Sequence, residues 1–236
     1  MPIDHDITMY SPTMFYENEN VIMMQRYIDY ILEYRDNAID FLELGIGRGE
    51  TIRLLRQHFK KLTVLDGEKR LIDQYKDRYP DIVFEHRFFE DYQPQKKFHN
   101  IGMGFVLDLV DSPVDLLRQY SDYLSQRGKI YISIENASSL HRLIAYEAGL
   151  LTDLNKLSES NEKFGHKIYY TYDEWVHIIE QAGLEIVASH GLFLKPFSTA
   201  QLNSLNLEPN VYEALSTTAK HFPKIANACF FVLEKP

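Results

Sequence analysis

The sequence predicts an α/β fold: a single domain built around a mostly parallel β-sheet, with helices between its strands. Short apolar runs alternate with stretches of helical periodicity over roughly a hundred residues, which is typical of βαβ units. The chain has 236 residues, of which 45% are apolar and 13% aromatic, enough for one large hydrophobic core. No repeat, low-complexity tract or flexible linker divides it into independent domains.

The first half of the chain is expected to open with a helix and to continue with alternating strands and helices. Segment 20–34 carries apolar residues at helical spacing, among them Ile28 and Ile31, which predicts an amphipathic helix. The apolar run 39–44 ends in glycines and predicts a buried strand. The next predicted elements are a helix over 50–59, a strand over 61–66, a helix over 71–80 ended by Pro80, a strand over 81–89 and a strand over 99–107.

Cap and turn signals predict the elements of the second half. Ser112 as N-cap, Pro113 at the first helical position and Gly128 past the end indicate a helix over 112–128. Thr171 and Glu174 form a capping-box pattern that begins a helix over 171–184. The other predicted elements are a strand over 129–136, a helix over 138–154, a polar stretch over 158–170, a strand over 185–194, a helix over 210–222 and a final strand over 227–235.

Composition restricts the class of function. The chain has 25 basic and 34 acidic side chains, a net charge of −9, which disfavours nucleic acid as the main partner. The single cysteine, Cys229, excludes a disulfide framework and a cysteine-based zinc site. The first 20 residues lack a secretory signal, and no window approaches the about 18–20 apolar residues of a membrane span. We therefore expect a cytoplasmic protein without membrane insertion.

The richest motif is a glycine turn between the first strand and the following helix. Gly45 and Gly47 let the backbone bend sharply and let a ligand approach it closely. A dinucleotide fingerprint would need a glycine at position 50, which is Glu50. Glu43, two residues before the first glycine, suits a ligand that carries an ammonium group. The alternative is a tight strand-to-helix connection without a ligand.

A second acidic residue supports a ligand site. The next strand ends at Asp66, about 20 residues further on, where a carboxylate can accept two hydrogen bonds from a ribose diol. Taken alone, Asp66 could equally cap the next turn. Its register with the glycine turn favours the ligand.

Together these residues resemble the class I S-adenosylmethionine-dependent methyltransferases. Segment 88–92 follows the third strand, where that family places adenine-contacting residues, and 98–108 resembles its fourth-strand segment. The resemblance covers 38–136 and implies a Rossmann-like, doubly wound, seven-stranded sheet, mostly parallel with the last strand antiparallel, and a helical lid insertion. The chain departs from the family pattern at His99, Phe105 and Asp108–Leu109, so no metal or acid–base role is transferred from that segment.

The resemblance also implies a cofactor, S-adenosylmethionine, with S-adenosylhomocysteine as product. It places the loop backbone at the methionine part, Glu43 at the ammonium group and Asp66 at the ribose. The full set of implied cofactor-binding residues is Glu43, Gly45, Ile46, Gly47, Asp66, Gly67, Phe89, Glu90, Gly104 and Phe105.

We expect a single methyltransferase domain over 1–236 with four parts. These are an N-terminal cap helix (1–37), the cofactor-binding core (38–136), a lid and substrate region (137–182) and closing strands (183–236). The apolar stretch Met9–Tyr16 is expected to fold over the cofactor, to pack on the core or to contact a second subunit in a homodimer.

The acceptor is expected beside the segment after the fifth strand, because ligands of parallel sheets bind at the carboxyl ends of strands. His141 has a pKa naturally near neutrality and is a candidate general base. Arg142 could pair with a phosphate or carboxylate of the acceptor, and Asn136 lies beside it. The alternative for His141 and Arg142 is an ordinary place on an exposed helix turn.

A second cluster, 164–170, predicts a lid or pocket wall, with His166 as a second candidate base and Tyr169 as an acceptor-binding residue. His166 could instead satisfy the backbone of a turn. The chain also resembles bacterial methyltransferases of cell-surface polysaccharide gene clusters, in a pattern formed by Asn136, Ser139–Arg142, Gly149–Leu151, Phe164–His166, Tyr169 and Phe193–Pro196. The remaining histidines show no metal-ligand spacing, so no metal is expected.

The function expected is methyl transfer to an oxygen or nitrogen of a small polar acceptor, such as a sugar, a nucleotide-linked sugar or a related cell-envelope or capsule precursor. One alternative is a protein or nucleic-acid methyltransferase, disfavoured because residues 103–106 lack the Asn-Pro-Pro-Tyr type of motif. Another is a catalytically silent, cofactor-binding regulatory subunit.

Overall fold

One seven-stranded sheet organises the protein, with strand order β3-β2-β1-β4-β5-β7-β6. The structure is a computed structural model, and it describes residues 18–36, 40–163 and 165–236. Strand β7 runs antiparallel to both its neighbours, while the pairs among β1 to β5 are parallel. The strands are β1 (Asp40–Leu44), β2 (Lys61–Asp66), β3 (Val83–His86), β4 (Phe98–Gly104), β5 (Leu124–Glu135), β6 (Glu185–Gly191) and β7 (Ala228–Glu234). The predicted mostly parallel sheet with an antiparallel last strand is confirmed.

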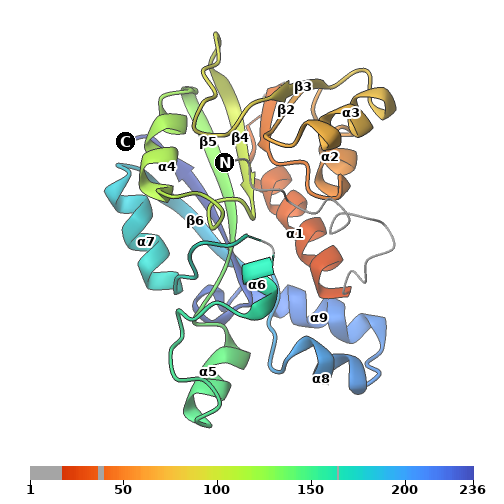
Figure 1. Ribbon diagram of the computed structural model, residues 1–236, viewed down its shortest axis with the longest axis vertical. Helices are drawn as coiled ribbons and strands as arrows, with labels where there is room; N and C mark the ends of the chain where they lie inside the picture. The colour runs from red at the N-terminus through yellow and green to blue at the C-terminus, as the bar shows by residue number, and fades with distance from the viewer. Residues whose placement is uncertain (1–17, 37–39, 164) are drawn as a thin grey trace.

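Helices cover both faces of this sheet (Figure 1). One face carries α1 (Asn18–Tyr34), α2 (Glu50–Leu55), α3 (Lys69–Arg78) and α9 (Pro209–Ala219). The other face carries α4 (Pro113–Ser121) and α7 (Tyr172–Gln181), which contact each other. The remaining helical segments are α5 (Leu140–Glu147), α6 (Glu159–Lys163), α8 (Thr199–Ser204) and the 3-10 turn η2 (Pro223–Ile225). None of the helices described is long and apolar enough to cross a membrane.

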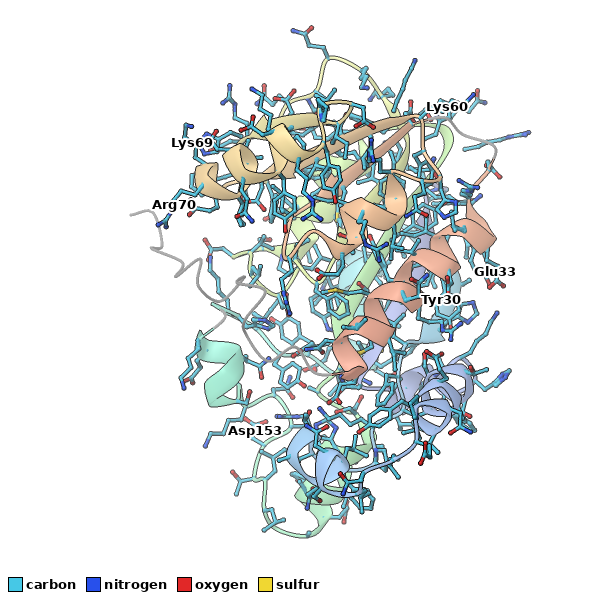
Figure 2. The ribbon with its side chains drawn as sticks, turned by 90° about the vertical axis from the view of Figure 1, so that its right-hand side faces the viewer. Tyr30, Glu33, Lys60, Lys69, Arg70 and Asp153 are labelled. Carbon is cyan, nitrogen blue, oxygen red and sulfur yellow. The ribbon has the colours of Figure 1, made fainter. Side chains whose placement is uncertain are left out.

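The alternation of side chains along each strand separates two hydrophobic cores. On β1, Phe41 faces the core beneath α1, and Leu42 faces the core beneath α4 and α7. The first core is strongly aromatic: Phe41, Tyr131 and Phe230 stack with ring centroids about 6 Å apart. Trp175 on α7 is fully buried in the second core. Figure 2 shows Tyr30 and Glu33 on the helix α1 that closes the first core, with Lys69 and Arg70 at the start of α3.

The predicted helix over 112–128 is wrong in its second half. It begins as expected, since Ser112 caps α4 and Pro113 follows, but α4 ends at Ser121. Leu124 pairs instead with Phe98 of β4, so that 124–128 begins β5. Gly128, read as a helix stop, lies inside this strand, where a Cβ would be 3.0 Å from the Phe98 carbonyl oxygen.

Other boundaries differ more modestly. The expected helix over 138–154 ends at Glu147, and β3 is limited to Val83–His86. Helices α6 and α8 were not predicted, because both are short and lack a long apolar stripe. The capping box of Thr171 and Glu174 at the start of α7 is confirmed. The stretch Met9–Tyr16 lies outside the described residues.

Candidate active site

The loops after β1, β2, β3 and β4, with the end of β5, surround one cavity of about 500 Å³. The order of the sheet reverses between β1 and β4, and such a reversal opens a crevice at the carboxyl ends of the strands. The volume lies within the range of roughly 300–1,000 Å³ that is usual for small-molecule sites. The lining includes the start of α1, the glycine turn, the end of β2, segment 88–90, segment 104–106 and the pair Glu135 and His166.

The glycine turn adopts the backbone conformation for which glycine is suited. Gly45 and Gly47 have φ values of 84° and 51°, in the left-handed region. The Gly45 N–H donates to the Leu65 carbonyl at 2.8 Å, which ties the turn to the end of β2. Gly49 shares this conformation, with φ at 79°, and it also has a packing role, because a Cβ there would collide with the ring of Tyr75 on α3. The first two glycines therefore shape the cavity wall, and the third allows close helix packing.

Glu43 presents a buried carboxyl group to the cavity. It is 1% exposed, and the Tyr27 hydroxyl donates to its Oε2 at 3.2 Å. Burial raises the pKa of Glu43 to about 8, although the Tyr27 hydrogen bond opposes this shift. Gly102, its neighbour on β4, leaves room for this pair, since a Cβ at position 102 would collide with the Glu43 carboxylate. A cationic group in the cavity would find a nearby carboxylate here.

Asp66 links the loops that follow β1 and β2. Its Oδ2 accepts from the Ile46 N–H at 2.8 Å, and its Oδ1 accepts from the Glu68 N–H at 2.7 Å. Asp66 therefore has a structural role in orienting the glycine turn, besides lining the cavity.

Two aromatic residues lie where an adenine is expected. Phe88 and Phe89 both line the cavity, together with Gly67 and Glu90. The predicted Phe89 is partly buried in the second core, and its carbonyl accepts from the Tyr120 hydroxyl at 3.0 Å. Phe88 is 57% exposed, and a Cβ on Gly67 would be 2.9 Å from its ring. Phe88, absent from the predicted set, thus presents an accessible ring face beside Gly67.

Gly104, the last residue of β4, and Phe105, which follows it, both line the cavity. Phe105 is a non-glycine residue in the left-handed region, with φ at 57°, a conformation that costs about 1–3 kcal/mol. Its N–H donates to the Ser133 carbonyl at 2.8 Å, which fixes the turn against β5. Strain of this kind is typical of functional sites.

Four predicted acceptor residues do not line the cavity. Asn136 is fully buried and donates to the Lys224 and Ala226 carbonyls. Arg142 donates to the Leu154 and Lys156 carbonyls and lies over the ring of the buried Tyr169, 4.5 Å from its centroid. The contacts of Arg142 join α5 to the loop that follows it, and those of Asn136 join the end of β5 to the segment around η2.

His141 is similarly engaged in structure. Its backbone N–H donates to the Lys195 carbonyl at 3.0 Å, and its Nδ1 is 3.2 Å from Ser139 Oγ. Burial, with the charges of Lys195 and Arg142, lowers the pKa of His141 to about 3. Such a ring is a weak base near neutral pH.

His166 does reach the cavity, and it meets two acidic residues there. Its Nδ1 lies 2.8 Å from Asp108 Oδ2, and Glu135, at the end of β5, lines the cavity beside it. Although burial acts in the opposite direction, contact with Asp108 and the charge of Glu135 raise the pKa of His166. Asp108 and Glu135 were missed as site residues. Their only sequence signal was their place at or just after the carboxyl end of a strand.

Comparison with known proteins agrees with this geometry. The family described as a methyltransferase domain matches residues 17–189. Among solved structures, the chain is similar to an S-adenosylmethionine-dependent methyltransferase from Clostridium acetobutylicum ATCC 824, with 11% identity, 91% of each chain covered and a TM-score of 0.59. No curated protein matches the sequence.

Two further solved structures show the same architecture. The plantazolicin methyltransferase BamL, in complex with a triazolic desmethylPZN analog and SAH, has 19% identity over 92% of this chain and 85% of that chain, with a TM-score of 0.59. The N-methyltransferase NodS from Bradyrhizobium japonicum WM9 has 14% identity over 92% and 95%, with a TM-score of 0.57. These identities establish the fold, and the family match covers most of the chain. The chain therefore belongs to the methyltransferase domain family and is a class I S-adenosylmethionine-dependent methyltransferase.

Proposed function

We propose that this enzyme transfers a methyl group from S-adenosylmethionine to an oxygen or nitrogen of a small polar acceptor. The observation that carries the proposal is a single cavity of about 500 Å³ with two chemically distinct parts. One part is formed by the glycine turn, Glu43, Asp66 and segment 88–90. The other, which we call the acceptor end, is lined by Glu135, His166 and Lys167.

The cofactor fits the first part by the chemistry of its donors and acceptors. We infer that Glu43 pairs with the ammonium group and that the backbone of 45–47 faces the methionine part. Asp66 accepts from the ribose hydroxyls. Gly67, Phe89 and Glu90, joined by the accessible ring of Phe88, enclose the adenine.

Methyl transfer requires the acceptor atom, the methyl group and the sulfur to lie in line. When bound, S-adenosylmethionine supplies a methyl group activated by a sulfonium. Gly104 and Phe105 border the position of that methyl group, and the strained, hydrogen-bonded turn at Phe105 fixes the wall. We infer that His166, rather than His141, contacts the acceptor, because His166 lines the cavity.

A sugar, a nucleotide-linked sugar or a related cell-envelope or capsule precursor is the acceptor class that we favour. The ionisable groups at the acceptor end suit a polar molecule with several hydroxyl groups. The resemblance of the clusters at 136–142 and 164–170 to methyltransferases of polysaccharide gene clusters points the same way. A net charge of −9 disfavours a nucleic acid.

The test begins with calorimetry of S-adenosylmethionine and S-adenosylhomocysteine binding to the full chain. Methyl release is then measured over a panel of sugars, amino sugars and nucleotide sugars, and the methylated atom is assigned by NMR. Absence of cofactor binding would refute the proposal. Cofactor binding without turnover on any acceptor would favour the alternative of a catalytically silent regulatory subunit.

A further inference from the structure

Three ionisable side chains from separate segments meet at the acceptor end. Asp108 follows β4, Glu135 ends β5 and His166 follows α6. One potential ligand atom from each lies within 4.8 Å of the other two. We call these three residues the acidic–histidine cluster. They stand 27 and 31 positions apart in the chain, so no local sequence motif indicates them.

Asp108 has a buried carboxyl group whose oxygens lack hydrogen-bond donors among the described residues. It is 2% exposed, and neither of its carboxylate oxygens accepts a hydrogen bond from a residue that the structure describes. His166 Nδ1 lies 2.8 Å from Oδ2, in ion-pair contact, and 3.4 Å from Asn161 Nδ2. A buried carboxylate without donors is costly. A ligand in contact with both Asp108 and His166 would reduce that cost.

The donor atoms of the cluster also suit a cation. Two carboxyl groups and one imidazole supply oxygen and nitrogen donors within 4.8 Å of one another. The nearby lysines are engaged elsewhere: Lys195 lies 2.8 Å from Glu19, and Lys167 lies 2.6 Å from Asp111. A divalent cation would balance both carboxylates and leave the imidazole as a neutral nitrogen donor.

The distance between Asp108 and His166, and the hydrogen bonds that hold the three residues in place, suit metal ligands. With metal–ligand bonds of about 2.0–2.2 Å, ligand atoms at right angles lie about 3 Å apart, close to the 2.8 Å between Asp108 and His166. Asn161 Nδ2 donates to Glu135 Oε2 at 2.7 Å, and the Asn161 carbonyl accepts from the His166 N–H at 3.0 Å. The Asp108 carbonyl accepts from the Lys167 N–H at 2.8 Å. Such outer contacts orient ligands in metal sites.

We propose that the acidic–histidine cluster binds one divalent metal ion of the Mn2+, Co2+ or Zn2+ class at the acceptor end of the cavity. One nitrogen and two oxygen ligands suit these ions, and three protein ligands leave open positions, as in catalytic metal sites. The open positions face the cavity, where an acceptor hydroxyl can bind. The proposal goes beyond methyl transfer itself, since none of the three residues belongs to the inferred cofactor part.

The test uses the full chain, freed of metal with a chelator and titrated with Mn2+ alone. Binding is followed by the loss of the free-ion signal in electron paramagnetic resonance, and with Co2+ by visible absorption. We expect one ion per chain, and an affinity at least about tenfold weaker in each of Asp108→Asn, Glu135→Gln and His166→Gln. Asp111→Asn is the matched control, because Asp111 is close in sequence but its side chain is 90% exposed, and it should bind as the wild type does.

Two results would overturn the proposal: no stoichiometric binding of Mn2+, Co2+ or Zn2+, or binding that the three substitutions leave unchanged. The first would leave the cluster as a metal-free group in which His166 takes a proton from the acceptor. Affinity for S-adenosylhomocysteine, measured on the same variants, separates this failure from failure of the proposed function. It also reports whether each variant has folded.

Discussion

At the residue scale, the protonation of Glu43 makes the stability of the ligand-free protein depend on pH. Burial raises the pKa of Glu43 to about 8 in the ligand-free protein, whereas in the unfolded chain the group ionises near its usual value of about 4.3. The folded protein therefore holds a proton that the unfolded chain has released between these two values. The free energy of unfolding falls as pH rises through this window, by at most about 1.4 kcal/mol per pH unit.

Glu43→Gln is expected to remove this dependence, because an amide does not ionise. As pH rises from 5 to 8, the range set by the two pKa values, the Tm of Glu43→Gln should increase relative to that of the wild type. Thermal unfolding at several pH values measures it. Glu33→Gln on the exposed side of α1 serves as control (Figure 2). A pH-independent difference would show that Glu43 is ionised in the ligand-free protein.

The same substitution tests the cofactor contact. If the ammonium group pairs with ionised Glu43, binding of S-adenosylhomocysteine to the wild type must release a proton below pH 8. Calorimetry in buffers of different ionisation enthalpy should detect that release, and Glu43→Gln should abolish it while weakening the affinity. Proton release that persists in Glu43→Gln would assign it to another group.

Asp66→Ala is expected to have two effects, because Asp66 holds the glycine turn as well as facing the cavity. Loss of the ribose hydrogen bonds should weaken S-adenosylhomocysteine binding by about 1–3 kcal/mol. Loss of the contacts to the Ile46 and Glu68 N–H groups should also lower the Tm of the ligand-free protein. Calorimetry and thermal unfolding measure the two effects. Asp73→Ala on the exposed side of α3 is the control, and an unchanged affinity in Asp66→Ala would refute the ribose contact.

That Glu43, the glycine turn and Asp66 line one cavity could be predicted because their signals are local. Glu43 and the glycines belong to one strand–turn–helix segment, and Asp66 ends the next strand. Asp108, Glu135 and His166 meet only in the folded sheet. Their proximity depends on the pairing of β4 with β5 and on the path of the loop after α6, which no periodicity in the sequence reports.

At the element scale, the boundary between α4 and β5 shows where local pattern fails. Residues 122–128 continue a helical pattern by composition, yet Leu124 gains a partner on β4 and Arg127 adopts a left-handed φ of 60°. Pairing with Phe98 occurs beside a register shift between Phe98 and Asn100. Such a bulge depends on contacts across strands, which outweigh a weak helical preference.

The capping box of α7 gives an element-scale prediction. Thr171 Oγ1 accepts from the Glu174 N–H, and Glu174 Oε2 accepts from the Thr171 N–H at 2.7 Å. Thr171→Ala should lower the free energy of unfolding by about 0.5–2 kcal/mol. Thr171→Ser should retain most of the stabilisation, because serine also supplies a capping hydroxyl. Urea unfolding measures the difference. Equal stability of the alanine and serine variants would mean that the cap contributes nothing to α7.

At the scale of the whole molecule, the parallel strands of the sheet and its two C-terminal strands have different roles. The parallel strands β1, β2, β4 and β5 end around the cavity, while β6 and β7 extend the sheet beside β5 and complete the two cores. In Figure 1, α5 and α8 lie at the end of the molecule away from α2 and α3. A ligand in the cavity should therefore restrict the loops of several strands at once and leave α5 and α8 little changed.

Binding of S-adenosylhomocysteine should stabilise the loops around the cavity more than it stabilises α5 and α8. A ligand at one hundred times its Kd adds about 2.7 kcal/mol to the free energy of unfolding, which for a chain of this size raises the Tm by roughly 5–11 °C. Hydrogen exchange should show new protection in 45–50, 66–68, 88–90 and 104–106, because these segments line the cavity. Helices α5 and α8 serve as internal controls. Protection centred on them, with the four segments unchanged, would place the ligand outside this cavity and contradict the assignment of Glu43 and Asp66.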